Sequence, residues 1–187
     1  MALGLRSDYS LALAYILLSM GALVVLQRID FPGQVRLLPA TRAWRVGVAA
    51  AAAVAVILLL WLSQAGPVSQ ISGRARSSLE VISVAALGPI AEELLFRGVI
   101  WSLLLTLARS RKNDWIALSV SSLLFGLMHV GYWLLDRKGL SAQTALHVTS
   151  MFAAGAVFGS VRMSSKSLLA PIASHALGNC LILALQT

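Results

Sequence analysis

The feature that most constrains this chain is a group of ionisable residues inside a long apolar run. Within residues 79–107, the segment EELLFRG (residues 92–98) sets Glu92, Glu93 and Arg97 among hydrophobic side chains. Such a run is expected to lie in lipid, where one charged side chain near the bilayer centre costs roughly 2.5–3.5 kcal/mol even on the most lenient scale. The fold must therefore supply these groups with partners or with a wet cavity.

Helical geometry separates the two glutamates. Glu93 and Arg97 are four residues apart, so on a helix they share a face and can form an ion pair. Glu92 is rotated about 100° from that pair, which leaves its carboxylate for another use. A buried ion pair that only fixes helix packing is the alternative interpretation, but two adjacent acids with one base fit it less well.

Composition extends this interpretation to the whole chain. Of 187 residues, 58% are hydrophobic and 12% charged, with a mean hydropathy of +0.83, which is too apolar for an ordinary soluble domain. We expect an all-α polytopic membrane protein: a single transmembrane domain over residues 1–187, built as a bundle of about six transmembrane helices around an intramembrane polar site. The expected spans are 11–26, 46–62, 79–107, 115–135, 142–161 and 168–185.

The basic residues follow the expected loops. The formal net charge is +8, but the lysines and arginines lie between apolar runs rather than along one helical stripe, which argues against nucleic acid as a partner. Linkers after the first, third and fifth runs carry nine of them, Arg162 and Lys166 included, against five on the other side. By the positive-inside rule both termini face away from the cytoplasm. We expect a multi-pass protein of the cell (inner) membrane of a prokaryote, with the lipid bilayer as its surroundings.

Two kinds of helix-shaping residue stand in the runs. Pro89 follows a glycine just before the glutamates and should kink or restart the helix there, because proline removes a backbone donor and clashes with the preceding turn. Pro171 stands one turn before His175 in the same way. In the fifth run, small residues including Gly155 and Gly159 allow close helix approach.

The remaining strongly polar residues of the runs are His129, His147, His175 and Asn179. At about 1.5 Å per residue, Glu92, His129 and Asn179 lie roughly 16–23 Å from the same membrane side, so they can converge. A carboxylate beside a histidine can take a proton from water, and a second histidine with an amide one turn away can bind the resulting oxyanion. This set indicates a hydrolase without a protein nucleophile.

Each residue also has a plainer explanation. A single His or Asn in a membrane helix often makes interhelical hydrogen bonds and nothing more. The spacing of His147 gives no support for a direct role, and Phe125 is expected to be a packing residue. Two histidines and two glutamates also permit a zinc site: the His-Glu-x-x-His pattern is absent, but a His-Glu-His set on separate helices could hold the ion. We expect no cofactor and no metal, with zinc as the alternative.

Three segments of this sequence resemble the CPBP family, the CAAX protease and bacteriocin-processing (ABI) group of glutamic-type intramembrane proteases. The family pattern is E-E-x-x-x-R, then F-x-x-x-H, then H-x-x-x-N on successive membrane helices. The chain has EELLFR at residues 92–97, FGLMH at 125–129 and HALGN at 175–179, in that order. The resemblance covers about residues 79–185.

The resemblance implies an activity and a role for each matching residue. Glu92 would be the base that activates water with His129, Glu93 would pair with Arg97, and the oxyanion site would be His175 with Asn179. The expected function is an endopeptidase acting on a membrane-associated or exported peptide or protein, in maturation, sorting-signal or leader processing.

Two functions of other classes remain open. A non-catalytic immunity or assembly protein could keep the fold and bind a partner. A proton-coupled transporter could use Glu92 and His129 as a relay, and inverted repeats would favour it. An intact base and oxyanion set favours the peptidase, and the oligomeric state is left open.

Overall fold

The computed structural model describes residues 78–108, 113–135 and 142–185, and also Leu17, Leu18, Met20, Gly21 and Val24. Over these residues it is helical and contains no strand, which agrees with the all-α prediction. The elements are α3 (Ser78–Ile82), η2 (Ser83–Leu87), α4 (Gly88–Glu93), η3 (Leu94–Ile100), α5 (Trp101–Ala108), α6 (Asn113–Leu135), α7 (Ala142–Ser165) and α8 (Leu169–Leu185). The predicted spans 11–26 and 46–62 lie outside the described residues, apart from the five separate positions.

The last three predicted runs agree closely with helices. Runs 115–135, 142–161 and 168–185 correspond to α6, α7 and α8, but α7 continues four residues past its predicted end. It stops at Lys166, whose φ of 53° is the left-handed conformation common just after a helix, and whose N–H donates to the Arg162 carbonyl at 3.0 Å.

The run from 79 to 107 is not one regular helix. Two π-helical segments, η2 and η3, interrupt it, and at the end of η2 the Gly88 N–H donates to the Ser83 carbonyl five residues back. Helix α4 then begins with Gly88 and Pro89, a first-turn position that suits the fixed φ of proline. A kink or a restart was predicted at Pro89, and the structure shows a change from π-helical to α-helical register there, while Leu87 and Gly88 keep right-handed helical dihedrals.

Among the helices that the structure describes, none is both long and apolar enough to cross a membrane. The six spans therefore stay a prediction.

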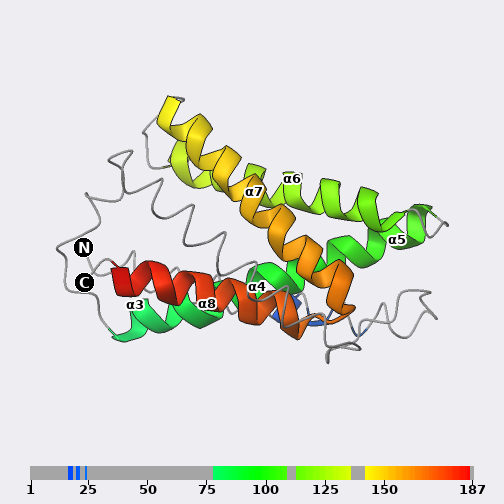
Figure 1. Ribbon diagram of the computed structural model, residues 1–187, viewed down its shortest axis with the longest axis horizontal. Helices are drawn as coiled ribbons and strands as arrows, with labels where there is room; N and C mark the ends of the chain where they lie inside the picture. Colours follow the sequence, from blue (N-terminus) through cyan, green and yellow to red (C-terminus); the bar gives the residue numbers. More distant parts are fainter. Residues whose placement is uncertain are drawn as a thin grey trace.

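The helices form two groups (Figure 1). Helices α6 and α7 pack against each other, and α8 runs beside the first part of the 78–108 segment. The direction of α8 is antiparallel to that segment, because the start of α8 packs near Leu94 while Asn179, further along, contacts Val84. The glutamates of α4 consequently lie beside α8.

Small residues bring α6 and α7 close together. A Cβ atom added to Gly155 would lie 3.2 Å from the Cα atom of Ser122 and from Phe125 Cδ1, and one added to Gly126 would lie 3.2 Å from the Phe152 backbone nitrogen. The predicted close approach is confirmed at Gly155. This contact brings the α7 backbone within reach of the buried arginine.

Candidate active site

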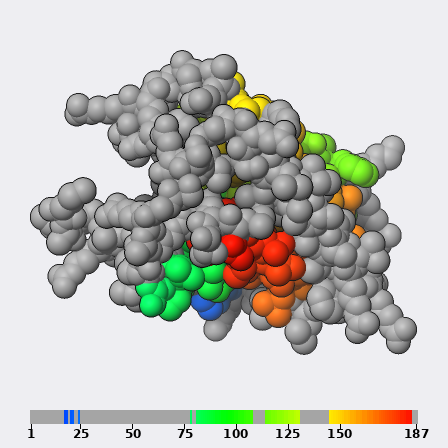
Figure 2. Space-filling view, turned by 60° about the vertical axis from the view of Figure 1, so that its left-hand side comes forward, coloured from blue at the N-terminus to red at the C-terminus, as the bar shows by residue number. Residues whose placement is uncertain are grey.

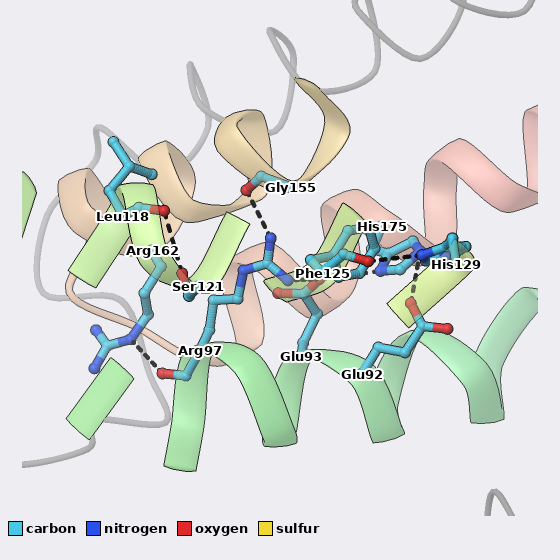
Figure 3. A network of polar contacts seen from close by, with 10 residues as sticks. All are labelled: Glu92, Glu93, Arg97, Leu118, Ser121, Phe125, His129, Gly155, Arg162 and His175. Carbon is cyan, nitrogen blue, oxygen red and sulfur yellow. Dashed lines mark hydrogen bonds and ion pairs between the residues drawn. The ribbon is translucent and has the colours of Figure 1, made fainter. Parts of the chain in front are cut away.

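Glu93 and Arg97 form the buried centre of the site, with both side chains fully removed from solvent. Arg97 Nη1 donates to Glu93 Oε1 at 3.1 Å, so the ion pair predicted from the four-residue spacing is present. Arg97 Nη2 also donates to the Gly155 carbonyl oxygen of α7 at 2.6 Å (Figure 3). One guanidinium therefore ties the 78–108 segment to α7.

Aromatic rings surround this guanidinium. Arg97 Cζ lies 4.8 Å from the ring centroid of Phe125, 5.9 Å from that of Phe96 and 6.0 Å from that of Phe158. Rings within about 6 Å of a cation attract it through their negative faces. The rings and the carboxylate together compensate part of the cost of burying the charge.

His175 of α8 completes this centre from the other side. Its Nδ1 lies 3.0 Å from Glu93 Oε1, and because a carboxylate only accepts, this nitrogen is assigned as the N–H donor. Its Nε2 lies 3.9 Å from Glu92 Oε2. The ring is stacked on Phe158 at a centroid distance of 4.5 Å and 16° between planes, which holds the imidazole in this orientation.

Glu92 points away from the ion pair, as the helical rotation predicted. Its side chain is 25% exposed, whereas that of Glu93 is 0% exposed. In Figure 3 its carboxylate points towards the histidine side of the site. The 3.9 Å distance to His175 is too long for a direct hydrogen bond, but it suits a bridging water.

His129 of α6 is oriented by its own helix. Its Nδ1 lies 2.8 Å from the Phe125 carbonyl oxygen, so Nδ1 carries the proton and Nε2 is the basic nitrogen of the neutral ring. The Phe125 ring contacts both His129, at 5.0 Å between centroids, and His175, at 5.8 Å. Phe125 is 1% exposed, as expected for a packing residue, and it brings the two histidines to one place.

Asn179 lies one helical turn beyond His175. Its Nδ2 donates to the Val84 carbonyl oxygen at 2.8 Å. It is therefore engaged with the backbone of η2, and the role in oxyanion binding that the resemblance implies stays a prediction. The other five predicted residues gather around Phe125 and the ion pair.

His147 lies nearer to the site than its spacing indicated. Its ring centroid is 5.9 Å from that of His129, at 64° between planes. The position of each residue along its own helix did not predict this proximity of His147 to His129, because such positions do not say which helices are neighbours.

One face of α7 carries contacts that the sequence analysis missed. Gly155 supplies a carbonyl, Phe158 supplies a ring, and Arg162 Nε lies 3.5 Å from the Arg97 carbonyl oxygen. The spacing 155, 158 and 162 places all three on one helical face, which was an available signal.

The assignment of Arg162 to a loop was wrong. The residue is 6% exposed and lies in the last turn of α7, because the helix runs past residue 161. Without Arg162, the linkers after the first, third and fifth runs carry eight lysines and arginines, against five on the other side. The orientation remains a prediction.

The described part of the chain contains no group of three or more His, Cys, Asp or Glu side chains that could hold a metal ion. Independence from metal stays a prediction, because it concerns activity.

Comparison with known proteins identifies one family. A family model described as Type II CAAX prenyl endopeptidase Rce1-like matches residues 74–181, which is more than half of the chain and includes all three motifs. Neither the curated proteins nor the solved structures include a match. The chain therefore belongs to the Rce1-like family of type II CAAX prenyl endopeptidases, which confirms the resemblance to the CPBP group and supports a peptidase located at the membrane.

Proposed function

We propose that this protein is a glutamic-type intramembrane endopeptidase in which Glu92 activates a water molecule. The observation that carries the proposal is the contrast between the adjacent glutamates. Glu93 Oε1 already accepts from Arg97 and from His175, whereas the Glu92 side chain is partly exposed and faces the histidine side of the site. Glu92 is thus the carboxylate that can meet both water and substrate.

The first step is proton transfer from water to Glu92. As the proton moves to the carboxylate, the water oxygen forms a bond to the carbonyl carbon of the substrate. The basic Nε2 of His129 accepts a hydrogen bond from the same water and orients it. The product of this step is a tetrahedral intermediate with one negatively charged oxygen.

The second step is stabilisation and collapse of that intermediate. Glu93 accepts a hydrogen bond from Nδ1–H of His175 and so fixes the ring; in the imidazolium form, which carries a proton on both nitrogens, the Nε2–H of His175 points towards the Glu92 side and can donate to the oxyanion. Asn179 already donates to the Val84 carbonyl, so its part in this step is either a second donation, to the oxyanion, or the positioning of the segment that carries Glu92. The carbon–nitrogen bond then breaks and the proton held by Glu92 moves to the leaving amine, which returns Glu92 to its starting state.

The substrate we propose is a membrane-associated or exported protein, processed at a peptide bond near a lipid anchor, sorting signal or leader. The family description supports a prenylated C-terminal peptide as the first substrate to test. We also propose that the chain is a multi-pass protein of the cell (inner) membrane of a prokaryote.

The test uses the full-length protein in lipid vesicles with a farnesylated peptide that ends in a CAAX sequence, and mass spectrometry of the products. Wild-type protein should cleave it, and Glu92→Gln should be slower by about 10³-fold, because the amide keeps the size of the side chain but cannot take a proton. Asp114→Asn is the matched control, since Asp114 pairs with the exposed Lys166 at 2.9 Å and has no proposed catalytic role.

A comparison in cells covers substrates other than a prenylated C-terminal peptide. Membrane peptides of cells that express wild-type protein or Glu92→Gln are compared, and uncleaved precursors should accumulate only with the variant. Cleavage by Glu92→Gln at the wild-type rate, or identical peptide sets in the two strains together with no cleavage in vesicles, would overturn the proposal.

A further inference from the structure

Helix α8 contacts the 78–108 segment on both sides of the junction between η2 and α4 at Gly88 and Pro89, which is called the break below. After the break, His175 lies against Glu92 and Glu93. Before the break, Asn179 donates to the Val84 carbonyl. Figure 2 shows the start of the segment, in green, beside the end of α8, in red, on one face of the molecule.

The Val84 carbonyl needs a partner because of the local sequence. In an α-helix it would accept from the N–H of residue 88, and in a π-helix from that of residue 89. The Gly88 N–H is directed to the Ser83 carbonyl, and residue 89 is a proline without an N–H. Both backbone donors that a helix offers to Val84 are therefore lost, and the Asn179 amide takes their place at 2.8 Å.

We infer that Asn179 is a positioning residue. It caps the Val84 carbonyl and, together with His175 one turn earlier, holds the η2–α4 junction that precedes Glu92 in a fixed geometry. Because both contacts come from one turn of α8, they fix the geometry of η2 and α4 on either side of Pro89. This inference rests on the proposed function, since the group that it positions is the Glu92 carboxylate.

These two contacts of α8 matter for catalysis because Glu92 lies less than one helical turn after Pro89. A small change at the break displaces the carboxylate relative to His175, and a displacement of about 1 Å can reduce a rate by about 100-fold. Donation by Asn179 to an oxyanion would act on the substrate directly. The two roles differ in whether they depend on Pro89.

A double-mutant cycle between Asn179→Ala and Pro89→Ala tests the inference in the full chain. Pro89→Ala restores an N–H at the position that a π-helical bond to Val84 requires, so it removes the need for the cap. Asn179→Ala should lower the melting temperature by about 5 °C when Pro89 is present, and by about 1 °C or less in Pro89→Ala. Equal losses in the two backgrounds would overturn the cap.

Kinetics with the cleaved peptide separate positioning from direct donation. Asn179→Ala should lower kcat about tenfold or more with KM unchanged when Pro89 is present, and about threefold or less in Pro89→Ala. Equal kcat losses in both backgrounds would overturn the positioning role and make Asn179 a direct donor.

Ser174→Ala is the control, because Ser174 is buried on the same helix but donates within it, to the Ala170 carbonyl at 2.8 Å. Its effect should be the same in both backgrounds. If Pro89→Ala does not fold, Asn179→Asp decides, since it keeps the size but lacks the N–H: a wild-type melting temperature would overturn the cap. The melting experiments need no substrate, so their outcome is independent of whether Glu92→Gln retains activity.

Discussion

Glu92 and Glu93 are neighbours in the chain and lie in opposite surroundings. Glu93 is fully buried and binds Arg97 and His175 through one oxygen, while Glu92 is partly exposed and 3.9 Å from the nearer His175 nitrogen. The rotation of about 100° between successive helical residues is enough to produce this difference. Two identical side chains thus differ in solvent access and in their partners, which fits a structural role for Glu93 and the reactive role proposed for Glu92.

The buried side is crowded but incompletely hydrogen-bonded. Within the described part of the chain, Glu93 Oε2, Arg97 Nε and Ser122 Oγ have no hydrogen-bond partner. A buried ion pair of this kind contributes little net stability, but losing one member leaves an uncompensated charge. The contrast between the two glutamates therefore predicts loss of activity when Glu92 is replaced, and loss of stability when the pair of Glu93 and Arg97 is broken.

The largest expected effect is on catalysis at the exposed side. Glu92→Ala and His129→Ala should each reduce peptide cleavage by about 10³-fold, because each removes a group proposed to act on the water. Both proteins should insert and melt within a few degrees of the wild type. A melting temperature lowered as far as in Arg97→Ala would show that Glu92 is structural too, and would erase the contrast.

The next effect is on stability at the buried side. Arg97→Ala should destabilise the protein by about 3–5 kcal/mol, because Glu93 remains buried without its cation. Equilibrium unfolding in detergent measures the loss, with Glu92→Ala as the comparison. Replacing both members, Glu93→Leu with Arg97→Met, should recover part of the stability, and no recovery would mean that the lost contacts to Gly155 and His175 dominate.

A smaller effect is expected where α7 approaches the arginine. Gly155→Ala puts a methyl group 3.2 Å from the Ser122 Cα atom, and overpacking of this kind costs about 1–3 kcal/mol. Ser160→Ala, an exposed position on the same helix, should change stability by less than about 0.5 kcal/mol. Equal stabilities of the two variants would show that α6 and α7 can separate without cost.

The smallest expected effect is that of metal removal. The proposed activation of water by Glu92 and His129 needs no Lewis acid, so dialysis against a chelator should leave the cleavage rate within about twofold of its starting value. Loss of activity that zinc alone restores would instead place a metal at the exposed side.

The helical period made part of this site predictable. Pairing of Glu93 with Arg97 and rotation of Glu92 away from them follow from spacing along one helix, and the structure shows both. The contact between His175 and Glu93 joins residues 82 apart, and nothing in either local segment specifies it. The π register of η2 was not predictable either, and it decides which carbonyl is left for Asn179.

Helix α7 carries none of the three sequence motifs, yet Gly155, Phe158 and Arg162 on one of its faces touch the groups that the motifs supply. Matching of the motifs consequently does not identify these three residues of α7. Grafting the three motifs onto another helical bundle would transfer the reactive groups without the surface that orients them. Conversely, exchanging α7 between relatives would alter the site while every motif stayed intact, so chimeras offer a way to tune this peptidase family without editing its signature residues.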